Sequence, residues 1–214
     1  GILQDFPQGW TDRAQKTIQI IRSFVTDIDL LLSNNRIFIN RTKDVGRLSK
    51  EDAISYGFTG PLLRACGVEY DLRKQAPYSG YENYEFEIPI STEGDVYDRY
   101  LVRMEEIRQS CRILEQALRK LPDGPLAIDD KSIVLPQKEE VYGNIEGLMN
   151  HFMLVIDGIK PPAGEIYSAI ESANGEIGFY IISDGTSYPY RVKCRAPSFA
   201  HYSAYSEIIQ GGMI

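Results

Sequence analysis

The chain has 214 residues, 43% of them hydrophobic and 25% charged, and its formal net charge is −7. These values are typical of a soluble globular protein, and the negative charge argues against nucleic acid or an anionic lipid surface as a partner. No apolar run approaches the ~20 residues of a membrane-spanning helix, and no signal-peptide pattern opens the sequence. Three unpaired cysteines argue against a disulfide framework, and with two distant histidines, His151 and His201, there is no metal-site pattern.

The sequence from 11 to 57 is predicted to be helical. Thr11 is a plausible N-cap. Apolar residues then recur at the three-and-four spacing of an amphipathic helix, at Ile18, Ile21, Val25, Ile28 and Leu32. Weak helical character is expected over 36–41, and a short helix over 50–56 that Gly57 ends.

The stretch 58–84 has no clear helical or strand period, yet it is rich in tyrosine and apolar side chains. A long irregular segment of this kind is usually functional, and its buried backbone groups need partners. We expect a structural network of Arg64, Asp71 and Arg73, with Arg64 and Asp71 buried and hydrogen-bonded to each other or to the loop backbone. The alternative is that these side chains orient a polar head group or carry protons.

Alternation over 84–88 predicts a strand, and Asp95 is expected to cap the strongest helix of the chain. Its apolar stripe is Tyr100, Met104, Ile107, Cys111, Leu114, Leu118 and Leu121. We predict that this stripe packs antiparallel against the first helix, with Leu114 buried. Arginines off the stripe are expected to form a solvated face or to meet an acidic partner.

A further helix is predicted from Glu139 to about Ile159, with His151 beside its apolar face as a hydrogen-bonded structural residue. Strands are expected over 165–183 and 188–195, around a turn at Asp184-Gly185. An odd register places Phe179 opposite Val192 and Glu176 opposite Arg195. The fold class is therefore α+β: a long-helix bundle with a small antiparallel hairpin, in one domain over 1–214.

No catalytic residue is visible, because no nucleophile has an adjacent base and no glycine pattern has phosphate-loop spacing. The polar candidates are the Arg64, Asp71 and Arg73 network in the loop, and Glu176, Arg191 and Arg195 in the hairpin. We predict that the chain alone binds no metal and oxidises neither NADH nor hydrogen. The residues by themselves lead no further than an α+β domain with a tyrosine-rich polar loop.

Three long segments resemble a known family: GFTGPLLRACGVEYDLRKQAPYSGYE, GDVYDRYLVRMEEIRQSCRILEQAL and GEIYSAIESANGEIGFYIISDGTSYPYRVKCRAPSF. The family is the hydrogenase-like D subunit of bacterial NADH:quinone oxidoreductase, respiratory complex I. The resemblance runs in order from about Gly1 to Phe199. It implies a fold like that of the large subunit of nickel–iron hydrogenases.

The resemblance also implies a peripheral-arm subunit on the cytoplasmic side of the inner membrane, in contact with the terminal iron–sulfur subunit and near the membrane arm. Quinone, NADH, FMN and iron–sulfur clusters are then cofactors of the complex and not of this chain. The hairpin residues Asn174, Glu176, Arg191 and Arg195 are candidates for the wall of the quinone cavity. Asn174 stands where relatives usually carry Arg or Lys, so a charge role is in doubt there.

The quinone-binding histidine and tyrosine of that family lie before Gly1, and its final segment lies after Ile214. We therefore expect a central and C-terminal fragment without a complete active site, and the Gly-Ile opening and Gly-Gly-Met-Ile ending agree. Two alternatives remain open. One is a fragment of the large subunit of a membrane-bound nickel–iron hydrogenase, and the other is a cofactor-free structural interaction module.

Overall fold

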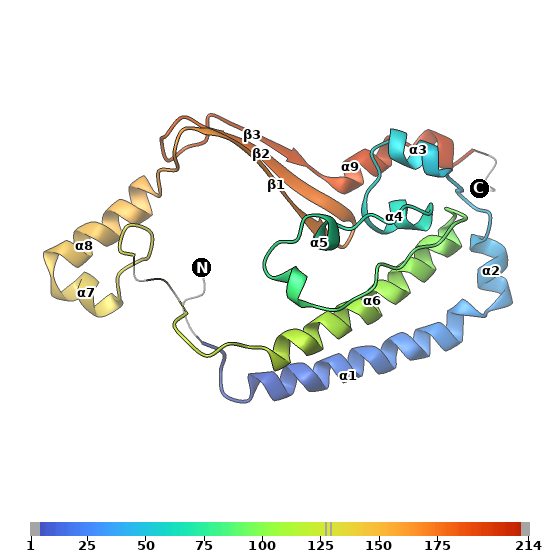
Figure 1. Cartoon of the computed structure of the whole chain (residues 1–214), viewed down its shortest axis with the longest axis horizontal. Coiled ribbons are helices and arrows are strands. Elements are labelled where there is room, and N and C mark those ends of the chain that lie inside the picture. The colour runs from blue at the N-terminus through green and yellow to red at the C-terminus, as the bar shows by residue number, and fades with distance from the viewer. Residues whose placement is uncertain (1–4, 127, 129, 211–214) are drawn as a thin grey trace. The chain divides into compact units, whose positions relative to one another are not determined.

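A computed structural model of the chain describes residues 5–126, 128 and 130–210 (Figure 1). The first four and last four residues, on which the fragment expectation partly rests, lie outside the described residues. The chain divides into two compact units, and each is described by itself. The larger contains Gly9–Leu121, Ser168–Gly178 and the described residues from Cys194 on; the smaller contains the other described residues. The expectation of a single domain stays a prediction.

Two long helices form the frame of the larger unit, α1 (Trp10–Ile28) and α6 (Val96–Arg119), and they lie side by side (Figure 1). Their ion pairs run in opposite sequence order, because Arg22 Nε bonds Glu115 Oε1 at 2.9 Å and Asp29 Oδ2 accepts from Arg108 Nη2 at 2.6 Å. The helices are therefore antiparallel, as predicted. The π-helical turn η1 (Asp29–Ser33) continues α1 at its C-terminal end. At the other end, the N-cap of α1 is Gly9 and not the predicted Thr11.

The predicted apolar stripe of α6 was wrong in part. Leu114 is 49% exposed, although Met104 and Cys111 of the same stripe are buried. A single stripe cannot describe α6, because both α1 and α4 (Gly60–Ala65) pack against it. Contact on two sides buries positions off the heptad as well, which are Val102, Gln109 and Ile113.

Short helices fill the rest of the larger unit, and the expected helices over 36–41 and 50–56 are confirmed as α2 (Arg36–Thr42) and α3 (Lys50–Ser55). The stretch 58–84 is less irregular than predicted. It contains α4, α5 (Leu72–Gln75) and the 3₁₀ turn η2 (Tyr81–Asn83). After the sheet come α9 (Pro197–Tyr202) and α10 (Tyr205–Ile208). A buried cluster holds these pieces together, formed by Leu48, Ala53, Phe58, Leu63, Cys66 and Ala204.

The strand predicted over 84–88 is not a strand. Phe86 is buried between two exposed glutamates, so the predicted alternation of burial is correct. The backbone of these glutamates, however, is hydrogen-bonded to side chains of α6 and not to another strand. Gln116 accepts from Glu85 N at 2.9 Å and donates to Glu85 O at 2.7 Å, and Gln109 Oε1 accepts from Glu87 N at 3.1 Å. Glutamines of a helix thus satisfy the backbone groups that a neighbouring strand satisfies in a sheet.

In the smaller unit the helix predicted over 139–159 is broken into α7 (Lys138–Gly143), α8 (Ile145–Phe152) and the π-helical turn η3 (Met153–Asp157). Asn144 separates α7 from α8 and caps α8, since its side chain accepts from Gly147 N at 2.6 Å. The expected apolar face is largely exposed, with Ile145 78% accessible.

A three-stranded antiparallel sheet has the order β1 (Gly164–Ser172), β2 (Gly175–Ser183) and β3 (Arg191–Arg195). Together with the helices it confirms the α+β class, whereas the likeness to nickel–iron hydrogenases stays a prediction. The single strand predicted over 165–183 was wrong, because the turn Ala173-Asn174 folds it into a hairpin. The third strand begins at Arg191 and not at Tyr188, since Pro189 has no N–H for the ladder.

Glu176 and Arg195 are neighbours across β2 and β3, as predicted. Arg195 Nε lies 4.0 Å from Glu176 Oε1, and Arg195 Nη1 donates to the Glu176 carbonyl at 2.6 Å. The other pairs of the expected register, Phe179 with Val192 among them, stay predictions.

Asp95, the predicted cap of α6, is buried and has two roles. Its Oδ1 accepts from Asp98 N and its Oδ2 from Asp44 N, both at 2.8 Å. Asp95→Ala is therefore expected to lower the free energy of unfolding by about 2 kcal/mol, because both donors lose their partner. Urea unfolding checks this, with Ser49→Ala at the exposed cap of α3, which accepts from one backbone N–H, as the control. Equal losses in both variants would contradict the double role.

Candidate functional site

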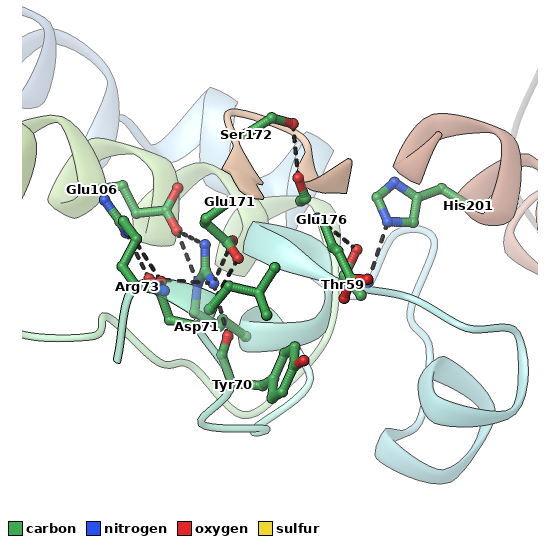
Figure 2. Close-up of polar contacts among 12 residues, drawn as sticks. Thr59, Tyr70, Asp71, Arg73, Glu106, Glu171, Ser172, Glu176 and His201 are labelled. Carbon is green, nitrogen blue, oxygen red and sulfur yellow. Dashed lines mark hydrogen bonds and ion pairs between the residues drawn. The ribbon is translucent and has the colours of Figure 1, made fainter. Parts of the chain in front are cut away.

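The side chain of Arg64 is the centre of a buried ionic cluster in the larger unit. Figure 2 labels the three carboxylates of this cluster, Asp71, Glu106 and Glu171. The turn before it is specified locally, since Gly60 takes a positive φ of 66° and Pro61 suits the first turn of α4. The Arg64 side chain is 1% exposed. Its Nε donates to Glu106 Oε1 at 2.9 Å, and its Nη1 donates to Glu171 Oε1 at 2.9 Å and to the Tyr70 carbonyl at 2.8 Å. Its Nη2 also donates to Glu106.

Asp71 completes this cluster and begins α5. Its carboxylate is fully buried and lies 3.7 Å from Arg64 Nη1. It caps α5 by accepting from Arg73 N at 2.9 Å, and it binds the Arg73 side chain at 3.0 and 2.6 Å. Burial alone raises the pKa of Asp71, but the hydrogen bonds and charge of Arg73, with the charge of Arg64, outweigh burial and hold the pKa below its ordinary value. The predicted burial and contact of Arg64 and Asp71 are confirmed.

Glu171 of β1 is the third carboxylate of the cluster, and it is 3% exposed. Its Oε2 accepts from Leu72 N at 3.3 Å, and its backbone N–H donates to the Tyr78 hydroxyl at 2.9 Å. Burial, the largest influence, and the nearby charge of Asp71 raise the pKa of Glu171, against the opposing effect of Arg64. The cluster thus joins α4, α5, α6 and β1 through charged side chains.

Aromatic rings cover the other side of Arg73. Its guanidinium carbon lies 4.9 Å from the Phe86 ring centroid and 5.9 Å from that of Tyr81. Tyr81 in turn contacts the rings of Tyr78 and Tyr84 edge to face. Phe86 and Tyr81 therefore cover the Arg73 guanidinium, and this aromatic cover helps to keep water from the Arg73–Asp71 pair.

Thr59 is the centre of a second cluster, at the start of α4 (Figure 2). Its Oγ1 accepts from Glu176 N at 3.0 Å and from Arg195 Nη1 at 3.3 Å, and its N–H donates to His201 Nε2 at 3.4 Å. Arg195 Nη2 donates to the Gly57 carbonyl at 2.9 Å. The hairpin candidates Glu176 and Arg195 therefore face the chain's own α4 segment.

His201 is expected to be neutral at physiological pH. Burial, with further effects from Arg195, Arg103 and Arg99, lowers its pKa from 6.5 to about 4. Because the folded pKa lies below the unfolded one, the stability it contributes is present above pH 6.5 and is lost as pH falls toward 4.

A pH series of urea unfolding checks this expectation. The wild type should lose about 1–2 kcal/mol more than His201→Gln between pH 6.5 and 4, a value discounted for partial solvation of the ring. The difference between the two proteins separates His201 from the carboxylates that titrate in the same window. Parallel pH profiles would contradict the depressed pKa.

Two arginines of α6, Arg99 and Arg108, are bonded within the chain. Arg99 Nη2 donates to the carbonyls of Gly46 and Gly94 at 2.6 and 2.8 Å, and Arg108 pairs with Asp29 and Glu105. The expectation of a solvated face was therefore wrong for these two residues, because backbone carbonyls and carboxylates of the chain itself occupy them.

The predicted site residues fall into two groups, with two further residues outside them. Arg64, Asp71 and Arg73 lie together, and Glu176 and Arg195 meet at Thr59. Asn174, in the β1–β2 turn, donates to Ser198 Oγ at 3.5 Å. Arg191 is exposed and belongs to the smaller unit.

Sequence reasoning missed Glu106, Glu171 and Thr59. Glu106 lies within the polar residues of α6, where nothing distinguishes it from Glu105. Glu171 is one carboxylate in a strand with several polar positions. Their one available signal was the presence of Arg64 in an apolar stretch, since a buried guanidinium needs carboxylate partners from elsewhere in the chain.

Within the described ranges, no group of three or more His, Cys, Asp or Glu side chains has a metal-binding arrangement. The described helices also include none that is long and apolar enough to cross a bilayer. The predicted lack of a metal in the isolated chain stays a prediction.

Comparison with known proteins covers the whole chain. The family model described as "Respiratory-chain NADH dehydrogenase, 49 Kd subunit" matches residues 1–214. The C/D subunit of NADH-quinone oxidoreductase from Bdellovibrio bacteriovorus is 53% identical over 100% of this chain and 38% of that relative. The D subunit from Myxococcus xanthus is 53% identical over 100% of this chain and 52% of that relative. The D subunit from Methylacidiphilum infernorum is 49% identical over 100% of this chain and 51% of that relative. The chain thus spans about half the length, or less, of these relatives.

Proposed function

Because the chain belongs to the family of the 49 kDa subunit of respiratory-chain NADH dehydrogenase, we propose that it forms part of a peripheral-arm subunit of an NADH:quinone oxidoreductase. In this proposal it helps to build the quinone-reduction module next to the subunit with the terminal iron–sulfur cluster. The observation that carries the proposal is the match of the family model to residues 1–214. Identity near 50% to relatives named as the D subunit of NADH-quinone oxidoreductase supports it.

The chain's contribution is proposed to be scaffolding and not chemistry. In the described residues the buried carboxylates and Arg64 are bonded within the chain, Arg64 and Asp71 to charged side chains and Asp95 and Asp98 to backbone N–H groups. Quinone, NADH, FMN and iron–sulfur clusters would be cofactors of the assembled complex, and none would be bound by this chain itself. Asn174, Glu176, Arg191 and Arg195 remain proposed cavity-wall residues, with Arg64, Asp71 and Arg73 as the network behind the loop.

Exposed apolar faces support a place in a larger assembly. On α1 and η1 these are Ile20, Phe24, Leu30 and Leu31; on α8 and η3 they are Ile145, Leu148, Phe152, Val155 and Ile156. Large exposed apolar surfaces mark interaction sites. We propose that the peripheral-arm subunits, especially the one with the terminal iron–sulfur cluster, and the membrane arm are the partners, on the cytoplasmic side of the inner membrane.

The same faces are the observation that favours the second candidate, a structural interaction module without a cofactor. The two candidates differ in what loss of the protein does to electron transfer. Nothing on the described part of the chain favours the nickel–iron hydrogenase alternative, and the names of the relatives point to quinone reduction.

The test is to delete the gene that encodes the full-length protein and to assay the membranes. NADH:quinone reductase activity is expected to fall at least tenfold and to return on complementation, while hydrogen oxidation is unchanged. The purified chain by itself is expected to oxidise neither NADH nor hydrogen and to contain no stoichiometric metal in elemental analysis. Unchanged quinone reductase activity in the deletion strain would refute the proposal, and loss of hydrogen oxidation would favour the hydrogenase alternative.

A further inference from the structure

Two carboxylates of the Arg64 cluster lie at the same nitrogen. Arg64 Nη1 is 2.9 Å from Glu171 Oε1 and 3.7 Å from Asp71 Oδ2. Both side chains are almost inaccessible, at 3% and 0% exposure. Two carboxylates that share one buried site resist simultaneous ionisation, because each negative charge opposes the other.

The charges of the cluster do not balance within its direct contacts. Three carboxylates, Asp71, Glu106 and Glu171, meet two guanidiniums, Arg64 and Arg73. The charge of Arg103 acts on Glu106, but no ion pair links it to Glu171 among the described residues. With all three carboxylates ionised, the directly bonded groups carry one surplus negative charge in a site that excludes water, which is costly.

The surplus charge falls on Glu171 and not on its neighbours. Asp71 is bound by the Arg73 side chain at 3.0 and 2.6 Å in addition to its contact with Arg64. Glu106 accepts from both Arg64 Nε and Nη2 and is the most accessible of the three, at 16%. Glu171 has one guanidinium nitrogen at 2.9 Å and one weaker backbone donor, Leu72 N at 3.3 Å.

We propose that Glu171 is a buried proton-binding site, which takes up one proton while the neighbouring Asp71 stays ionised, and that this proton tightens the contact of β1 with the Leu72–Tyr78 segment. The charged and titratable groups that act on Glu171 are Arg64 of α4, Asp71 at the cap of α5, Arg73 of α5, and the tyrosines Tyr70 and Tyr78. From α6, Glu106 and Arg103 are linked to this group through Arg64. The inference does not depend on the proposed function.

Protonation of Glu171 makes the stability of its surroundings depend on pH in one direction. The folded pKa of Glu171 lies above the ordinary value of 4.5, because of burial first and then of Asp71. A raised pKa means that the stabilisation is full below the unfolded value and is lost as pH rises through the folded value. The segment Leu72–Tyr78 contacts Glu171 at both ends, since Leu72 N donates to the Glu171 carboxylate and the Tyr78 hydroxyl accepts from the Glu171 backbone N–H. This segment should therefore open more often at higher pH.

Infrared difference spectroscopy of the full-length protein, titrated from pH 4.5 to 8, tests the proton directly. The carbonyl band of a buried protonated carboxylic acid is expected, and it should disappear as pH rises above the ordinary glutamate range. Glu171→Gln should lack this band. Glu69→Gln, at an exposed glutamate of the same stretch, should keep it. A band that Glu171→Gln retains, or no band at any pH, would overturn the proposal.

Segment-resolved hydrogen exchange of the wild type supplies a test that needs no variant. After correction for intrinsic rates, protection of the amides of Leu72–Tyr78 should fall by up to about tenfold per pH unit within the titration window. Protection in the middle of α6 should not change. A uniform change in both segments, or constant protection of Leu72–Tyr78 from pH 4.5 to 8, would overturn the proposal even if Glu171→Gln did not fold.

Discussion

Arg64→Ala is expected to lower the free energy of unfolding of the full-length protein by about 3–5 kcal/mol, the largest loss of the substitutions considered. The guanidinium is 1% exposed and donates to Glu106, Glu171 and the Tyr70 carbonyl. Alanine removes these donors together and leaves buried carboxylates without their cation. Urea unfolding with a common slope measures the loss.

Arg64→Lys separates the charge from the geometry. Lysine keeps one positive charge but not the planar fork that reaches three acceptors, so an intermediate loss is expected. Arg36→Ala, at an exposed arginine of α2, should change stability by no more than about 0.5 kcal/mol. A loss in Arg64→Ala that is no larger than in Arg36→Ala would mean that the cluster is not structural.

The Arg64 cluster marks how far sequence reasoning reaches here. Burial of Arg64 and Asp71 was predictable, because an apolar loop with many backbone groups needs a side chain with several donors. The carboxylates opposite Arg64 were not predictable, since Glu106 and Glu171 lie 42 and 107 residues away in the chain. Only the tertiary fold brings such partners together.

The helices and strands show the same division. Periodicity predicted the antiparallel pairing of α1 with α6, but it placed Leu114 in the contact, because one stripe cannot represent packing on two sides of α6. Alternation correctly placed Phe86 inside, but it predicted a strand where glutamines of α6 take the place of a neighbouring strand. Local sequence patterns thus predict which side chains are buried more reliably than they predict which groups those side chains contact.

The proposed function rests on the family resemblance and not on any local pattern. No catalytic pattern could be derived from residue types and spacing. Three long segments indicated the family, and the match of the family model to residues 1–214 then confirmed it. Two glycines in the first and third of those segments, Gly60 and Gly175, have a structural reason. They lie where α4 meets the β1–β2 turn, and neither position has room for a side chain.

Gly60→Ala is expected to cost about 2–5 kcal/mol, from left-handed backbone strain and from overpacking together. The φ of Gly60 is 66°, and a Cβ there would lie 2.3 Å from the Gly175 Cα and 2.7 Å from its N. Because the obstacle is backbone, it cannot turn aside as a flexible side chain can. The first residues of α4 and of β2 must therefore move apart. The hydrogen bonds from Glu176 N and Arg195 Nη1 to Thr59 Oγ1 must then lengthen.

Gly57→Ala is the matched control, because Gly57 has a similar φ of 70° but no atom within 4 Å of the place that an alanine methyl group would take. It should lose only the strain, about 1–2 kcal/mol. The difference between the two variants therefore measures the close approach of α4 to β2 and not the backbone conformation. Urea unfolding gives both values, and in Gly60→Ala the titration of His201, which is bound to Thr59 N, should also move toward its ordinary pKa of 6.5. Equal losses in the two variants would show that the approach at Gly175 can relax at little cost, and Thr59 would then not be held in place by the glycine pair.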